Sequence, residues 1–305
     1  METELENLKL ILTSPRERAP GTIVSYLQTA RTFLTFFGDG GPPTDKDYRR
    51  FFIRRREKGI SERTLAKEFV QLNKLAIANN WPWPFTADDR PVAEEEPFAP
   101  AFTPEEIQTL ILARDKYSKG EAFYLAVSTA WGLRREEMIR IRKRDYNELT
   151  IKIKTAKHGR RVEHLIPDEI NPILQGFHPK LTDVNSLSYM FYRILKKAGI
   201  DRRKGYGWHS IRRILRTALE WSLAENRLPL SLVADYMGWS KTQKGIVYGG
   251  SPMLGLYFHP EAMSSDPHAI ERKMLEVHPF LKFWKSAPQT IDGQSPEHSE
   301  TPQAT

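Results

Sequence analysis

Two clusters of basic residues precede a tyrosine in the C-terminal half of the chain. Arg134 follows a glycine, Arg212 ends the histidine-containing segment 209–212, and Tyr257 lies further on in the apolar segment 253–259. Guanidinium groups match phosphate oxygens through paired hydrogen bonds, and preorganised cations stabilise the negative charge of a phosphodiester under attack. These residue types predict a site in which a tyrosine hydroxyl attacks a phosphodiester that arginines hold.

Four segments, in this order, resemble motifs of the tyrosine recombinase (phage integrase) family. Residues 130–138 (AWGLRREEM) resemble its Gly-Leu-Arg-x-x-Glu-Leu motif, 208–213 (WHSIRR) its His-x-Leu-Arg box, and 236–240 (YMGWS) its Leu-Gly-His/Trp-Ser box. Residues 250–259 resemble the segment that carries the nucleophilic tyrosine. The family's order of arginine, lysine hairpin, His-x-x-Arg, His/Trp and tyrosine is reproduced over residues 104–262.

The resemblance implies a set of catalytic residues with distinct roles. The set is Arg134, Lys157, His209, Arg212, Trp239 and Tyr257. The arginines are expected to hold the phosphate, the histidine to accept or donate a proton, and the indole N–H to donate a hydrogen bond. The lysine is expected to protonate the departing 5′-hydroxyl group. Glu137 is expected to orient a neighbour or cap a helix rather than to do chemistry.

Two tyrosines compete for the role of nucleophile. Tyr248 follows the 236–240 box at the spacing usual in the family, but the helix-breaking run 249–252 comes directly after it. Tyr257 has the better local context, with a Tyr-x-His ending, and requires an insertion relative to the family. Tyr257 is preferred and Tyr248 is the alternative.

Two lysines compete in the same way for the role of general acid. Lys157, in the segment 157–161 (KHGRR), best matches the family's Thr-Lys-x-Gly turn. Lys154, which precedes Thr155, is the alternative.

The resemblance also implies a mechanism without metal, ATP or any other cofactor. The tyrosine hydroxyl cleaves one DNA strand to form a 3′-phosphotyrosyl link, and the 5′-hydroxyl of a partner strand then attacks that link. A type IB topoisomerase or telomere resolvase shares this chemistry and is an alternative. A DNA-binding regulator that keeps the fold without catalysis is another.

The charge of the chain favours a polyanionic partner. Its formal net charge is +8 and its basic residues are clustered, and such clusters bind nucleic acid by releasing counterions from phosphates. The residues expected to contact DNA are Arg54, Arg55, Arg56, Lys154, Arg160, Arg161 and Arg213. The absence of cysteine excludes disulfides, thiol catalysis and cysteine-ligated metals.

Hydrophobic periodicity predicts a mainly α protein with a small β-hairpin. The resemblance implies that the chain is arranged as a two-domain DNA clamp, with a helical core-binding domain at residues 1–84 and an α-rich catalytic domain of the tyrosine recombinase type at 103–284. The Pro-, Ala- and Glu-rich stretch 85–102 is expected to be a linker, and 285–305 a disordered tail. Strands are expected near 149–153 and 162–166.

The expected partner is double-stranded DNA carrying a specific recombination site. The resemblance implies a homotetramer on two DNA sites that forms from a monomer or weak oligomer in solution. The apolar cluster at 280–284 is expected either to dock in a neighbouring protomer or to pack on its own core. The sequence contains neither a membrane span nor a secretory signal, so a cytoplasmic, DNA-associated protein of prokaryotic or viral origin is expected.

Overall fold

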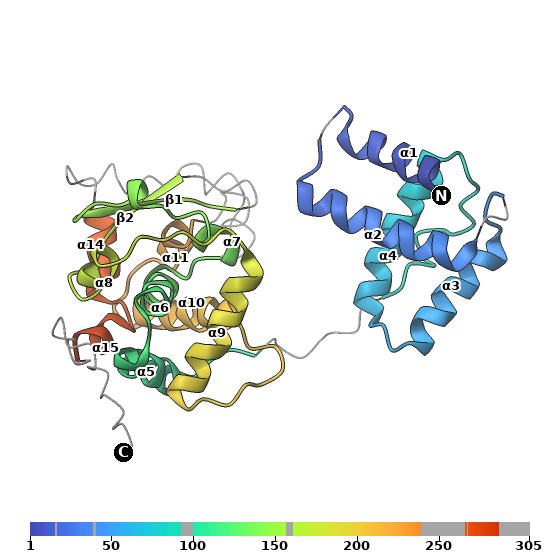
Figure 1. The fold of residues 1–305 in the computed structure, drawn as a ribbon. Coiled ribbons are helices and arrows are strands. Elements are labelled where there is room, and N and C mark those ends of the chain that lie inside the picture. The colour runs from blue at the N-terminus through green and yellow to red at the C-terminus, as the bar shows by residue number, and fades with distance from the viewer. Residues whose placement is uncertain are drawn as a thin grey trace, which may run out of the picture. The chain divides into compact units, whose positions relative to one another are not determined.

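The computed structural model describes residues 1–15, 17–38, 41–92, 100–156, 161–238, 266 and 268–286. The chain divides into two compact units, Met1–Phe98 and Ala99–Thr305 (Figure 1). Helices dominate both units, and a two-stranded antiparallel sheet lies in the second. The expected fold class, mainly α with a small β-hairpin, is confirmed.

The N-terminal unit is a helical bundle around an aromatic core. Its described helices are α1 (Glu2–Thr13), α2 (Pro20–Phe37), α3 (Asp45–Glu57) and α4 (Glu62–Ala78). Local signals set their starts: Pro20 lies in the first turn of α2, Thr44 and Asp47 form a capping box on α3, and Ser61 caps α4. The sequence analysis did not identify α1, which is charged over much of its surface and buries little more than Leu8 and Leu12.

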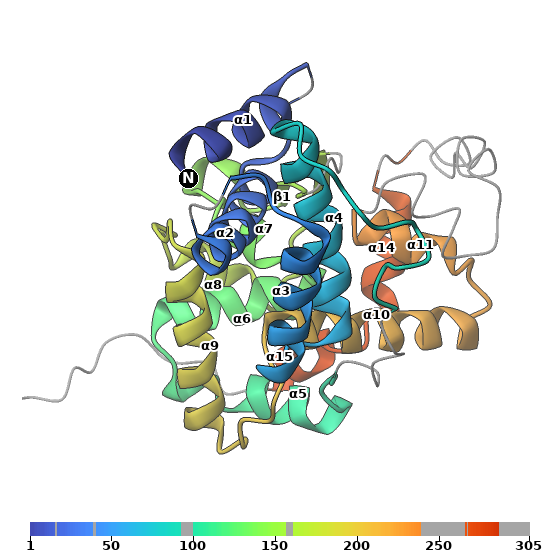
Figure 2. The same ribbon diagram turned by 90° about the vertical axis from the view of Figure 1, so that its right-hand side faces the viewer.

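Helices α2, α3 and α4 meet at stacked aromatic rings. The Phe33 ring lies 5.0 Å from that of Tyr48 and 5.3 Å from that of Phe51, between centroids. Trp83 and Phe85, beyond the end of α4, pack edge to face against the same core. Figure 2 shows α3 and α4 side by side in this unit. The ordered bundle therefore extends to Phe85, the first residue of the stretch expected to be a linker.

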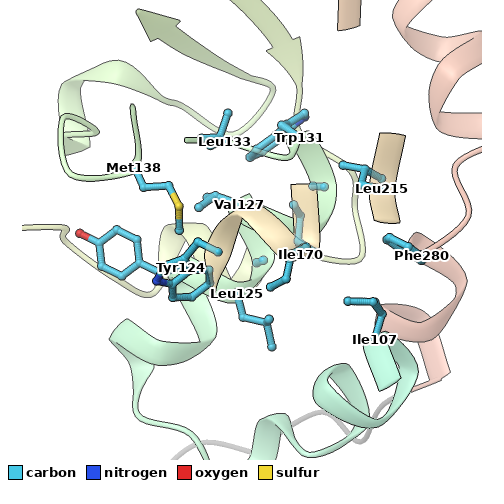
Figure 3. Close-up of a cluster of buried hydrophobic side chains, with 14 of the residues drawn as sticks. Ile107, Tyr124, Leu125, Val127, Trp131, Leu133, Met138, Ile170, Leu215 and Phe280 are labelled. Carbon is cyan, nitrogen blue, oxygen red and sulfur yellow. The ribbon is translucent and has the colours of Figure 1, made fainter. Parts of the chain in front are cut away.

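The C-terminal unit is built around α6 (Lys119–Trp131). Its other described elements are α5 (Pro104–Leu112), α7 (Arg135–Met138), β1 (Thr150–Lys154), β2 (Arg161–Leu165), α8 (Asn171–Gln175), α9 (Val184–Ala198), α10 (Trp208–Glu225), α11 (Ser231–Tyr236), α14 (Ala269–Glu276) and α15 (Leu281–Ser286), with short 3₁₀ turns at Arg114–Lys116 and Lys143–Asp145. Every residue of α6 from Phe123 to Trp131 is buried. Figure 3 shows side chains of α6 packed against residues from several other elements of the unit, including Ile107 and Phe280. A helix that is apolar on all sides is expected at the centre of a domain.

The hairpin places its charged side chains on one face. Strands β1 and β2 pair from Thr150 opposite Leu165 to Lys154 opposite Arg161. Ile151 and Ile153 point into the core, while Lys152 and Lys154, which alternate with them, are exposed. This alternation is the two-residue period of a strand.

Helix α15 packs against the core of its own unit. Phe280, Leu281 and Trp284 are buried there, and the Trp284 indole Nε1 donates a hydrogen bond to Thr129 Oγ1 of α6 at 3.1 Å. Of the two expectations for this cluster, packing on its own core is the one observed. The helix extends to Ser286, two residues into the expected tail, and 287–305 lie outside the described residues.

Candidate active site

Some of the expected catalytic residues lie outside the described part of the chain. These are Lys157, Trp239, Tyr248 and Tyr257, and the expected DNA contact Arg160 lies outside as well. The remaining candidates are described: Arg134, Lys154, His209 and Arg212 in the catalytic set, and Arg54, Arg55, Arg56, Arg161 and Arg213 among the DNA contacts.

Arg134 is fixed by the buried carboxylate of Glu137. The Arg134 Nη1 donates to Glu137 Oε1 at 2.8 Å, and the Arg134 backbone N–H donates to Glu137 Oε2 at 2.7 Å. The backbone N–H of Ala156, at the end of β1, also donates to Glu137 Oε1, at 2.8 Å. One carboxylate thus joins the arginine at the start of α7 to the hairpin. The expectation that Glu137 orients a neighbour is confirmed.

Glu137 remains charged although it is only 2% exposed. Burial by itself would raise its pKa, but hydrogen bonds from the Ala156 and Arg134 backbone N–H groups and the nearby Arg134 guanidinium lower the pKa below the ordinary value. The negative charge is therefore retained at neutral pH and holds the cation of Arg134 in one position.

Arg212 is a buried cation held by backbone carbonyls. Its Nη1 donates to the Gly132 carbonyl and its Nη2 donates to the Met237 carbonyl at 3.3 Å. Burial, together with repulsion from Arg134, lowers the pKa of Arg212 to about 10. The guanidinium is still protonated at neutral pH, so two positive charges lie close together.

Gly132 allows the first motif to reach Arg212. It ends α6 in the left-handed region, with φ of 59°, and its carbonyl accepts the Arg212 hydrogen bond. A Cβ at this position would lie 3.1 Å from Leu215 Cδ2 and 3.1 Å from Met237 Cε. A glycine is needed here because the backbone is left-handed and the packing around it is close.

Gly238 brings the third motif against the hairpin. Its φ is 64°, and a Cβ would lie 2.6 Å from Thr155 Cγ2 and 3.0 Å from Val162 Cγ2. The end of α11 therefore packs on the turn end of the hairpin, next to the residue whose N–H binds Glu137. The α6–α7 junction, the hairpin, α10 and the end of α11 converge on one site.

His209 lies in the first turn of α10 beside this site. Its side chain is open to solvent on one side. Desolvation by the surrounding protein atoms nevertheless lowers its pKa, and repulsion from Arg135 and Arg212 lowers it further. A histidine with a lowered pKa is neutral at pH 7 and can accept a proton. The preceding residue, Trp208, anchors the helix because its indole Nε1 donates to the Leu187 carbonyl at 2.8 Å.

The remaining candidates of the C-terminal unit lie in different surroundings. Lys154 and Arg161 are exposed and directly opposite each other at the turn end of the hairpin. Two positive charges directly opposite each other repel and destabilise the hairpin. An anion bound at this end would reduce that repulsion. Arg213 instead donates to the Pro100 carbonyl at 2.9 Å and ties α10 to the start of the unit.

The arginines expected to bind DNA in the N-terminal unit have separate partners. The Arg55 Nε donates to Glu68 Oε2 at 2.9 Å, and Arg56 Nε donates to Glu62 Oε1 at 2.7 Å. Arg54 lies over the Phe36 ring, with its Cζ 5.5 Å from the ring centroid. The three neighbours in sequence are therefore not equivalent in structure.

The sequence analysis missed the contacts that link the motifs. Arg135 lies close enough to His209 to lower its pKa, and its Nη1 donates to Ser188 Oγ at 3.0 Å. The hydrogen bond from the Ala156 backbone N–H to Glu137 could not be expected from the sequence either, because every residue except proline carries such a donor. Among the described residues no group of three or more histidine or acidic side chains could hold a metal ion, and no helix is long and apolar enough to cross a membrane.

The architecture and the site can be compared with known proteins. No protein-family model and no curated protein matches this sequence. A lambda integrase dimer bound to a COC′ core site is similar in structure, with a TM-score of 0.64 and 15% identity over 81% of this chain and 76% of the integrase chain. The chain has the tyrosine recombinase fold.

Two further structures share the tyrosine recombinase fold with this chain. The XerH site-specific recombinase, bound to a palindromic difH substrate after cleavage, has a TM-score of 0.57 and 18% identity over 87% of this chain and 84% of XerH. The Tn1549 transposon integrase, in complex with transposon right end DNA, has a TM-score of 0.56 and 16% identity over 90% and 98% of the respective chains. At such identities the likeness concerns the fold.

Proposed function

We propose that this protein is a site-specific DNA recombinase that breaks and rejoins DNA strands through a 3′-phosphotyrosyl intermediate. The observation that carries the proposal is the convergence of Arg134, Arg212 and His209 from two motifs at one point of a tyrosine recombinase fold. Glu137 compensates the charge of only one of the two cations, so the site keeps a net positive charge that favours an anion. A phosphodiester supplies that anion.

Arg134 and Arg212 can stabilise the pentacoordinate phosphorus of the transition state. Arg212 uses two of its N–H groups on the Gly132 and Met237 carbonyls, and Arg134 uses one on Glu137. A guanidinium has five N–H donors, so donors remain on both for the non-bridging oxygens. Because the carboxylate and carbonyls fix them before the substrate binds, little reorganisation is needed in the transition state.

The proposed reaction exchanges one ester of phosphate for another. The tyrosine oxygen forms a bond to phosphorus, the bond from phosphorus to the 5′-oxygen breaks, and the leaving oxygen takes up a proton. The tyrosine proton passes to a base, for which neutral His209 is suited. The hairpin lysine, Lys157 or its alternative Lys154, supplies the proton to the 5′-oxygen. The free 5′-hydroxyl of a partner strand reverses the steps, so no cofactor is required.

We propose Tyr257 as the nucleophile, with Tyr248 as the alternative. Both belong to the part of the chain outside the described residues, so the choice rests on local sequence. The aromatic hydroxyl of Tyr236 lies at the same end of the unit but is unsuited, because it is buried and donates to the Ala130 carbonyl at 2.8 Å. Burial also raises the Tyr236 pKa well above its ordinary value.

The first test traps the covalent intermediate. The full chain is incubated with nicked duplexes carrying candidate attachment sites of its host element, so that the cleaved end diffuses away and the protein–DNA adduct accumulates. Tyr257→Phe is expected to abolish the adduct while DNA binding remains, because only the nucleophilic oxygen is lost. Tyr248→Phe, a matched removal of one hydroxyl group, is expected to keep the adduct.

Other outcomes of this trap have definite meanings. An adduct lost in Tyr248→Phe and kept in Tyr257→Phe reverses the assignment of the nucleophile. Sequence-specific DNA binding without an adduct, in the unsubstituted chain, identifies a non-catalytic regulator. In a separate assay on supercoiled plasmid, relaxation without joining of paired sites identifies a topoisomerase.

We further propose that recombination takes place in a tetramer on two DNA sites. A lambda integrase tetramer bound to a Holliday junction has a TM-score of 0.58 with this chain and 14% identity over 78% of it. In the same proposal, the protein integrates or excises a mobile element, which is a virus or a plasmid. It is then a DNA-associated cytoplasmic protein of prokaryotic or viral origin. Joining assays with two labelled duplexes test for the paired-site reaction.

A further inference from the structure

The N-terminal unit has a hollow of about 490 Å³ between α2 and the C-terminal half of α3. Its floor is formed by the buried Phe51 and by the half-buried Phe36 and Arg55. Its rim includes the exposed side chains of Arg54 and of Arg31 on the facing helix. The hollow is therefore apolar and rigid below and cationic above.

The charge in the lining has one sign. Arg31, Arg54, Arg55 and Lys58 line the hollow, and its lining contains no carboxylate. Among the residues that the structure describes, none pairs with Arg31, Arg54 or Lys58 as a carboxylate partner. Three cations converge on one open hollow with their charges uncompensated, which attracts an anion.

Arg55 belongs to the scaffold of the hollow rather than to its charge. It forms an ion pair with Glu68 of α4, whose side chain is only 7% exposed. Loss of one partner of such a pair is strongly destabilising, because the other charge stays buried without compensation. Arg55 thus joins α3 to α4 and fixes the floor.

Of the three cations without a carboxylate partner among the described residues, Arg54 rests on an aromatic ring. Its guanidinium lies over the Phe36 ring, with Cζ 5.5 Å from the ring centroid. A cation that rests on an aromatic ring loses less conformational freedom when it binds an anion than a free side chain does. Arg56 points elsewhere, pairs with Glu62 and does not line the hollow.

We propose that this hollow binds a backbone phosphate of the DNA duplex, with Arg54, Arg31 and Lys58 as its ligands. The proposal rests on the proposed function, because it takes DNA as the partner. A phosphate group carries the compact negative charge that three converging cations complement, and guanidinium groups bind its oxygens in pairs. Phosphate contacts fix the position of the protein and carry no sequence information. The hollow therefore contributes the same affinity and orientation whatever the DNA sequence.

The test compares two variants of α3 that each remove one positive charge. Arg54→Gln removes a ligand of the hollow, whereas the control Arg49→Gln removes an arginine that pairs with Asp45 at 2.7 Å and does not line it. Both side chains are exposed, so both variants are expected to fold. Binding of the full chain to two unrelated DNA duplexes of equal length is measured by fluorescence anisotropy across a series of salt concentrations.

Arg54→Gln is expected to lose affinity for DNA, by the same factor on both duplexes, while Arg49→Gln is expected to keep it. Because log K falls with log salt by about 0.9 for each phosphate contact, Arg54→Gln should bind about eightfold more weakly in 0.1 M salt, with a slope shallower by about 0.9. Arg31→Gln and Lys58→Gln should behave similarly. Arg49→Gln should leave the slope unchanged.

Other results overturn the proposal in distinguishable ways. Equal slopes for Arg54→Gln and Arg49→Gln, with strong binding by the unsubstituted chain, reject the hollow and leave the proposed function standing. A loss on one duplex only rejects the phosphate assignment in favour of base contacts. Failure of the unsubstituted chain to bind any duplex rejects the proposed function itself.

Discussion

At the scale of single residues, one negative charge organises the cations of the candidate site. Glu137 accepts hydrogen bonds from Arg134 Nη1, from the Arg134 backbone and from the Ala156 backbone. All three partners are donors, so only an ionised carboxylate satisfies them together. The position therefore requires an acid rather than an amide of the same shape.

Glu137→Gln is expected to destabilise the protein by about 2–3 kcal/mol at pH 7, because an amide N–H₂ group would face N–H donors. It should also slow formation of the covalent DNA adduct, since Arg134 loses its fixed position. Urea unfolding of both proteins measures the first effect, and the nicked-substrate trap measures the second.

The pH dependence of this difference follows from the lowered pKa of Glu137. In the unfolded chain the carboxyl has its ordinary pKa of 4.5, and in the folded state the pKa is lower. The stabilisation is therefore fully present above pH 4.5 and is lost as the pH falls through the folded value. The gap between wild type and Glu137→Gln should narrow in acid. A gap of the same size at every pH would contradict the assignment.

Glu163 on β2 provides the matched control for this pair. Its side chain is 44% exposed and its Oε1 lies 3.8 Å from Lys152 Nζ. Exposed ion pairs contribute less than about 1 kcal/mol, so Glu163→Gln should change neither the unfolding midpoint nor the adduct yield appreciably.

At the scale of elements, close backbone packing holds the motifs together. The junction of α6 and α7 reaches α10 through Gly132, and the end of α11 reaches the hairpin through Gly238. Both glycines adopt positive φ and both face atoms of another element. The site is thus a meeting of chain ends and turns on a rigid helical core, the usual place for functional residues.

Gly238→Ala is expected to cost at least 2 kcal/mol and to reduce the adduct yield, because its Cβ would meet Thr155 Cγ2 at 2.6 Å. Gly199→Ala is the control: its φ of 71° is also positive, but nothing lies within 4 Å of the added Cβ. The control should cost only about 1 kcal/mol of conformational strain and keep full adduct yield. Thermal unfolding and the trap assay compare the two. Equal effects would show that strain alone, without the hairpin contact, governs position 238.

At the scale of the whole molecule, the chain closes its C-terminal unit with its own last described helix. Trp284 is buried to 1% exposure, and Arg114 Nη1 donates to its carbonyl at 3.0 Å. The Arg114 guanidinium also lies near the Trp284 ring, at 5.9 Å from the centroid. The half-buried Phe283 also packs against this core, so among the described residues the apolar side chains of α15 contact their own unit.

The protein is therefore expected to be a monomer in solution without DNA and to assemble only on its substrate. Sedimentation equilibrium at micromolar concentration measures the first state, and the same experiment with duplex DNA measures the second. A stable dimer in the absence of DNA would contradict the self-contained packing of α15. Trp284→Ala should cost about 3–5 kcal/mol by opening a cavity, whereas Lys285→Ala on the exposed side of the helix should leave stability unchanged.

Much of the architecture follows from local sequence signals. The caps at Ser61, Thr103 and Ser118 fix where helices begin, and the two-residue alternation around Ile151 and Ile153 fixes the hairpin. Such signals depend on neighbours in the chain, so sequence alone suffices to find them. Helix α1 was not expected from the sequence, and it buries only Leu8 and Leu12 although it contains other apolar residues.

The order of the motifs, likewise, is determined by the sequence, and with it the residue types of the candidate site. Which of those residues bind one another is decided by the tertiary structure. Arg54, Arg55 and Arg56 are alike in sequence, yet Glu68 binds the second, Glu62 the third, and the first lies on Phe36 over an open hollow. Ion pairs and close backbone contacts depend on how helices approach one another in space, and residue spacing along the chain does not encode that approach. The residue types that carry the proposed chemistry can therefore be identified from the sequence, whereas the partner of each charged side chain is determined by the tertiary structure.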